Sequence, residues 1–134
     1  MFDTRSGQGP TGDFVGKREG GETTTYQVAG LPVEQGGAGD CGIPNAANAV
    51  LINLVAIQPE GVGNLRAFAT GTTPTGGVVN FAPTSPAMNN SNAVVVPLSA
   101  DGEIDLFVNS PSRQGQDAAH VRGVVLGFYI ETPS

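Results

Sequence analysis

The residues that could act as nucleophile and base are few, because the chain has one cysteine, Cys41, and one histidine, His120. A cysteine paired with a histidine can form a nucleophile, and Asn and Asp residues that could orient the histidine are plentiful. Cys41, however, lies in GAGDCGIP, a Gly- and Pro-rich connection without a nucleophile signature. No Lys, Arg or His stands near it in the sequence to favour the thiolate. We therefore predict an inert or partly buried thiol, no catalytic residues and no enzymatic activity.

A second candidate group is acidic and consists of Asp101, Glu103 and Asp105. Several carboxylates on a loop can bind calcium, and a pair of carboxylates can hydrolyse a glycosidic bond. The glycine of DGEID stands second rather than sixth, so the calcium-loop pattern is not met. Asp101-Gly102 is instead typical of a tight hairpin turn, with the other two carboxylates on the returning strand. We predict neither a metal site nor a bound cofactor.

The charge balance excludes several classes of partner. Six basic residues stand against 12 acidic ones, and the sequence pI is about 4.4. Without a cationic patch, nucleic acid is excluded as a partner. The one local basic pair, Lys17-Arg18, stands beside Glu19 and is predicted to lie in a solvated loop. No apolar run reaches the ~18 residues of a membrane span, so membrane insertion is not expected.

Composition indicates many short strands in one domain over residues 1–134. Charged residues make up 13% of the chain, while there are 20 Gly and 10 Pro. This is typical of strands joined by frequent turns. The most informative segment is NAVLINLVAIQ (48–58), in which both alternating sets of side chains are apolar. Such a strand is expected to be buried on both faces.

The other segments also favour strands over helices. Further strands are predicted from alternation and β-branched content at residues 22–30, 64–70, 78–82, 92–98, 103–109 and 121–130. We expect 64–70 to form a hairpin with 48–58, and 103–109 to return from the Asp101-Gly102 turn as the hairpin partner of 92–98. The predicted fold class is all-β, an antiparallel β-sandwich of about eight strands with jelly-roll-like or Greek-key connections. In a sandwich, the second apolar face of 48–58 requires a cover, either the loops at 31–44 and 83–91 or another copy of the chain.

Taken together, these landmarks resemble a family. The segments that carry the resemblance are FDTRSGQGP (2–10), YQVAG (26–30), CGIPNAANAVLINLVAIQPEGVGNL (41–65), VVNFAP (78–83), NSNAVVVPLSADGEIDLF (90–107) and HVRGVVLGFY (120–129). Their order and spacing resemble a β-rich module of large secreted and surface proteins of actinobacteria and other bacteria. The resemblance covers nearly the whole chain.

The resemblance implies an extracellular or cell-surface location but offers no agreed catalytic residues. No signal peptide is recognised, and the abrupt start at MFDTR is compatible with a leader or upstream region having been removed. Asp3 and Arg5 match the DTR of the module and could tie the amino end to the domain as a buried ion pair. Val124 stands where the family usually has Asp. If that Asp normally pairs with the arginine of DTR, Arg5 needs another partner here.

The sequence features alone do not indicate a function, but together with the resemblance they indicate a class of protein. We expect a non-catalytic secreted or cell-surface structural and interaction module that self-assembles into a homo-oligomer or surface assembly. The alternative is a carbohydrate- or cell-wall-binding domain whose loops supply Asn, Asp and Thr. The composition offers few aromatic side chains that could stack on a sugar, because Trp is absent and only two Tyr occur. Ligand identity, oligomeric state and strand order are left open.

Overall fold

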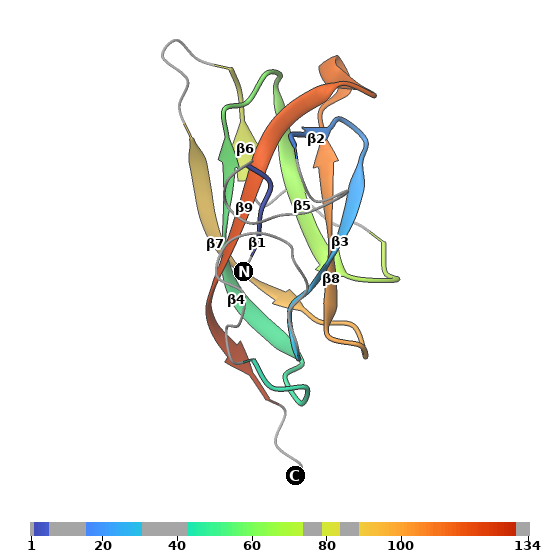
Figure 1. Cartoon of the computed structure of the whole chain (residues 1–134), viewed down its shortest axis with the longest axis vertical. Helices are drawn as coiled ribbons and strands as arrows, with labels where there is room; N and C mark the ends of the chain where they lie inside the picture. The colour runs from blue at the N-terminus through green and yellow to red at the C-terminus, as the bar shows by residue number, and fades with distance from the viewer. Residues whose placement is uncertain (1, 6–15, 31–42, 74–78, 84–88, 131–134) are drawn as a thin grey trace.

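The computed structural model describes residues 2–5, 16–30, 43–73, 79–83 and 89–130. This part of the chain is built from antiparallel strands and one short turn of 3-10 helix (Figure 1). The elements in chain order are β1 (Phe2–Asp3), β2 (Arg18–Glu19), β3 (Thr23–Gln27), β4 (Ala49–Ile57), β5 (Gly63–Ala69), β6 (Val79–Phe81), β7 (Asn90–Pro97), β8 (Glu103–Asn109), η2 (Pro111–Arg113) and β9 (Asp117–Tyr129). Within the described ranges no helix is long and apolar enough to cross a membrane.

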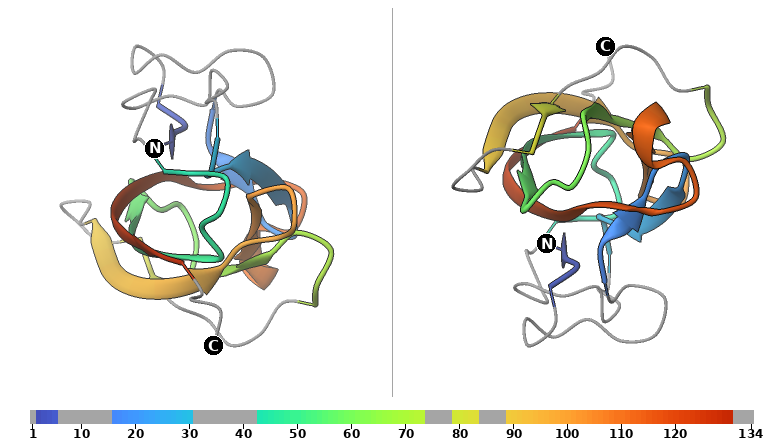
Figure 2. Two further views of the ribbon diagram at one scale, coloured as in Figure 1. Left: turned by 90° about the horizontal axis from the view of Figure 1, so that it is seen from below. Right: turned by 90° about the horizontal axis from the view of Figure 1, so that it is seen from above.

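The strands form two sheets that pack face to face. The first has the order β1-β9-β4-β7, with β2 also paired to β9, and the second has the order β3-β8-β5-β6. End-on views show the strands curving around an oval interior (Figure 2). The predicted antiparallel β-sandwich is therefore confirmed.

The interior between the sheets is filled by the alternate residues of each strand. In β4 these are Val50, Ile52, Leu54 and Ala56, all fully buried. The second sheet contributes Leu65, Ile104, Leu106 and Val108. Such burial of aliphatic side chains is the dominant favourable term in the stability of a small domain.

The expectation that 48–58 is buried on both faces was wrong for one face. The odd-numbered residues of β4 from Ala49 to Val55 are only half-buried, whereas Ile57 at the end of the strand is buried. The strand is central in its sheet, between β9 and β7, so its neighbours cover its edges. Its outward face is left with partial exposure, because the second sheet packs on the other side.

Both predicted hairpins were also wrong. β5 pairs with β8 and β6, whereas β4 pairs with β7 and β9. The connection after β4 crosses between the layers and includes Gln58 at φ +51°. Likewise β7 and β8 lie in different sheets, although the turn between them is tight, with Gly102 donating its N–H to the Ser99 carbonyl at 2.9 Å. Turn residues specify a local reversal but not which sheet receives the next strand.

Candidate functional site

Charged side chains concentrate where β1 lies against β9. Arg5 donates to the Asp3 carboxylate from Nε at 3.0 Å and from Nη2 at 2.7 Å, and Arg122 Nε lies 4.0 Å from Asp3 Oδ2. Asp3 is buried and the Arg5 side chain partly exposed. Burial by itself raises the pKa of Asp3, but hydrogen bonds from Arg5 and the charges of both arginines lower it below its ordinary value. The predicted Asp3–Arg5 pair is confirmed, and Arg5 needs no acid at position 124.

Thr4, between these two residues, ties β1 to β9 through its backbone and its hydroxyl. Its N–H donates to the Val121 carbonyl at 3.0 Å, and Thr4 Oγ1 accepts from the Val121 N–H at 3.0 Å. The same hydroxyl lies 3.0 Å from His120 Nδ1. Burial lowers the pKa of His120, as do the positive charges of neighbouring Lys17, Arg5 and Arg18, against a smaller opposing effect of Asp3. A neutral ring can accept the Thr4 hydroxyl hydrogen at Nδ1.

The prediction of a solvated loop at Lys17-Arg18 was wrong. Arg18 is buried in β2, where it pairs with Ala119 of β9. Its guanidinium donates to the Gly16 carbonyl at 3.1 Å and to the Glu22 carboxylate at 3.3 Å. Lys17 forms an ion pair with Glu60 at 3.5 Å. Sequence spacing gave no sign of this, because the strand is two residues long and its neighbour is distant in the sequence.

We call Asp3, Thr4, Arg5, His120 and Arg122 the β1–β9 polar cluster, and the Thr4 side chain at its centre holds the two strands together. The Thr4 side chain is fully buried, and its oxygen is already engaged by Val121 and His120. A hydroxyl closed to solvent cannot meet a substrate, so its hydrogen bonds serve packing. The chemical result is a set of charge-assisted contacts that fix the amino end on β9.

The acidic residues at the Asp101-Gly102 turn do not converge. Asp105 Oδ1 accepts hydrogen bonds from the Thr25 and Thr70 hydroxyls at 2.6 and 2.8 Å, on the outward face of the second sheet. Of the residues that the structure describes, no three or more His, Cys, Asp or Glu side chains gather in a potential metal site. Cys41 lies outside the described residues, so the expectation of an inert or partly buried thiol there stays a prediction.

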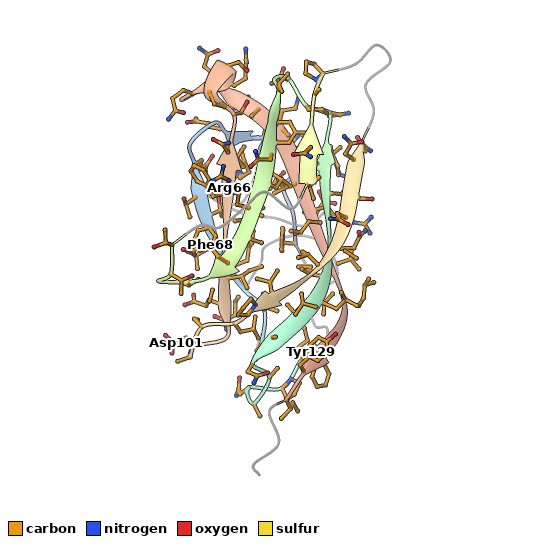
Figure 3. The ribbon with its side chains drawn as sticks, turned by 180° about the vertical axis from the view of Figure 1, so that it is seen from behind. Arg66, Phe68, Asp101 and Tyr129 are labelled. Atoms are coloured by element: carbon orange, nitrogen blue, oxygen red, sulfur yellow. The ribbon has the colours of Figure 1, made fainter. Side chains whose placement is uncertain are left out.

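A different kind of surface lies on the first sheet, facing away from the second. In the register of β4, Leu51 lies between Val95 of β7 and Gly127 of β9, and Ala49 lies between Pro97 and Tyr129. The bulge beside Leu51 adds Leu126. We call these residues the outer apolar face: Ala49, Leu51, Val95, Pro97, Leu126 and Tyr129. Tyr129 marks its position near the end of β9 (Figure 3).

A cavity of about 320 Å³ lies beside this face, between β5 and β7. Its lining residues are mostly apolar and none is ionisable: Ala67, Phe68, Ala69, Thr72, Thr73, Val94, Val95 and Pro97. Phe68 stands near the carboxyl end of β5 (Figure 3). The cavity was not predicted, because it depends on the approach of two strands from different sheets.

The chain was compared with known proteins. No protein-family model matches it, and no curated protein shows significant similarity to it. The likeness to the actinobacterial surface module therefore remains a prediction, and function has to be argued from the surface of the molecule.

Proposed function

We propose that this domain is a non-catalytic structural and interaction module of a secreted or cell-surface protein, and that copies associate through the outer apolar face. The observation that carries the proposal is the exposure of large apolar side chains on that face. Val95 is 51% exposed, Leu126 59% and Tyr129 49%. Apolar side chains gathered on one exposed surface are typical of interaction sites.

Electrostatics supports association at this face over other parts of the surface. The chain has a formal net charge of −6, so copies repel one another at most orientations. None of the residues of the outer apolar face is charged, and on the same sheet Asp3 and Arg122 lie 4.0 Å apart as an ion pair. Apolar contact at this face therefore requires no burial of an unpaired charge.

The test is the molar mass by light scattering over a range of concentrations. We expect the wild-type mass to rise above 13.6 kDa and Leu126→Glu to restore the monomer. The matched control is Val62→Glu, which adds the same charge at a side chain that is 62% exposed in the connection before β5. The control is expected to associate like the wild type. A monomer mass at every concentration, or equal effects of the two variants, would refute the proposal.

The second candidate is a carbohydrate- or cell-wall-binding domain, favoured by one observation. Phe128 and Tyr129 are 44% and 49% exposed near the end of β9. Exposed aromatic rings can stack on sugars, and the phenol adds a polar group. A glycan array tests this function. If the domain binds carbohydrate, the wild-type protein should give a binding signal that Tyr129→Ala abolishes and Val62→Ala preserves. A blank array for the wild-type protein removes this candidate.

A further inference from the structure

The edge of β7 that faces away from β4 lies next to the cavity and has unusual features for an edge strand. Of the strands that the structure describes, only β4 pairs with β7, and Asn90–Pro97 contains no charged residue. Natural edge strands commonly carry Lys or inward-pointing charges that prevent pairing with another chain. The exposed residues along it include Ser91, Ala93 and Val95.

The register shows which backbone groups face outward. Leu98 donates its N–H to the Asn48 carbonyl at 2.9 Å, directly after the Ala49–Pro97 pair. Because hydrogen-bonded pairs alternate in an antiparallel ladder, the even-numbered residues of β7 point their N–H groups toward β4. The odd-numbered residues Ser91, Ala93 and Val95 point their N–H groups away from β4. Pro97 occupies the next outward position, where its lack of an N–H removes no hydrogen bond to β4. Within the described part of the chain, no strand pairs with these outward groups.

Opposite this edge, the second half of β5 has only one strand partner among the described residues. The pairing of β6 with β5 ends at Leu65–Val79, so within the described ranges Arg66–Ala69 pairs with β8 alone. At the other end of β7, the Asn90 amide donates to the Asn80 carbonyl of β6 at 2.8 Å and joins the two sheets. Among the described residues, the result is a slot between β5 and β7 that has the Asn90–Asn80 contact at one end and is lined by Ala67, Ala69 and Val95.

We propose that this slot accepts an extended, uncharged segment of a partner protein, which adds to β7 as a further strand and places one large apolar side chain in the cavity. A single extended segment fits better than the edge of a second copy's sheet, because β5 and β6 stand on the far side of the slot. The uncharged lining excludes a charged side chain at the central position. The volume is about twice that of an engineered cavity that binds benzene, enough for an aromatic ring. Main-chain hydrogen bonds then provide affinity, and the cavity provides selectivity.

The probe is an acetylated, amidated pentapeptide of alternating threonine and valine with phenylalanine at its centre. Binding is measured by calorimetry and by NMR shifts of the amides of β7. We expect Ala93→Pro, which removes one outward N–H, and Ala67→Phe, which fills the cavity, each to weaken binding by at least about tenfold, or 1.4 kcal/mol. The matched control Ala93→Thr keeps the N–H and is expected to bind like the wild type. A peptide with lysine at its centre should bind far more weakly.

This inference does not depend on association through the outer apolar face. Leu126→Glu lies outside the cavity lining, so this variant should keep peptide binding even where it abolishes self-association. The inference is overturned if the wild-type protein does not bind the peptide, if Ala93→Thr weakens binding as much as Ala93→Pro, or if the lysine peptide binds equally well. It is also overturned if the NMR shifts centre on Leu126 and Tyr129 instead of β7.

Discussion

Substitution of Gly102 tests whether the tight turn between β7 and β8 packs against Ala29. Its φ is +78°, and a Cβ at this position would lie 2.8 Å from the Ala29 Cβ and 3.3 Å from the Ala29 carbonyl oxygen. Its carbonyl accepts the N–H groups of Val28 and Ala29 at 2.9 and 3.0 Å, so the backbone cannot easily move away. The left-handed conformation costs an L-residue roughly 1–2 kcal/mol. Crowding of packed atoms adds roughly 1–3 kcal/mol, so Gly102→Ala should lower the free energy of unfolding by about 2–5 kcal/mol.

The matched control is Gly71→Ala. Gly71 has φ +91° but no heavy atom within 4 Å of the position of an added Cβ. Gly71→Ala should therefore lower the free energy of unfolding only by the cost of the left-handed conformation, roughly 1–2 kcal/mol. Urea unfolding followed by far-UV circular dichroism measures both variants, with an unchanged m-value expected. If the two variants lose equal stability, contact between the turn and Ala29 contributes nothing and the packing argument fails.

Three further predictions concern β1 and β9. Gly123→Ala should displace the Phe2 ring, which stacks on Tyr26 at 3.8 Å, and lower the melting temperature, whereas Gly127→Ala meets nothing within 4 Å and should be nearly neutral. Because the folded-state pKa of Asp3 is lowered, its ionised form stabilises the fold above the unfolded pKa of about 3.9, and this contribution is lost as pH falls through the folded pKa. In urea unfolding, the difference in stability between wild type and Asp3→Asn should be large at pH 7 and shrink as pH falls below the unfolded pKa and through the lower folded pKa. The pKa of His120 is also lowered in the folded state, so on acidification the unfolded chain binds the proton first. The free energy of unfolding in urea should therefore fall as pH drops below about 6.5. If His120→Gln loses as much stability over the same pH range, the prediction is contradicted.

Strand positions could be predicted from the sequence because alternation is a local property. The predicted 103–109 strand matches β8, and 48–58 matches β4 to within one residue at each end. Tyr26, predicted to lie in a half-buried strand, is fully buried, and this burial raises its pKa. Strand partners were not predictable in the same way. Whether β5 joins the sheet of β4 or the opposite sheet depends on the path of a five-residue connection, Gln58–Val62, whose turn residues are compatible with both.

The polar cluster was predicted only where its members are close in the sequence. Asp3 and Arg5 are two residues apart, so their pairing followed from strand geometry. The contact between Thr4 and His120 joins residues 116 apart, and the burial of Arg18 depends on β9. Neither has a local pattern that could reveal it. The cavity beside β7 is hidden for the same reason, since its two walls come from different sheets.

The position of β9 has a consequence for how the chain folds during synthesis. β9 is the last strand, yet it pairs with β1, β2 and β4, and its bond from the Val121 N–H to Thr4 spans 117 residues. The first sheet therefore cannot close until nearly the whole domain is available, and topologies of this kind fold slowly. Before then, the apolar side chains of β4 lack their neighbour on one side. A ribosome-bound chain that ends before Asp117 should consequently expose an unpaired apolar strand and depend on chaperones or on a partner to keep it from aggregating.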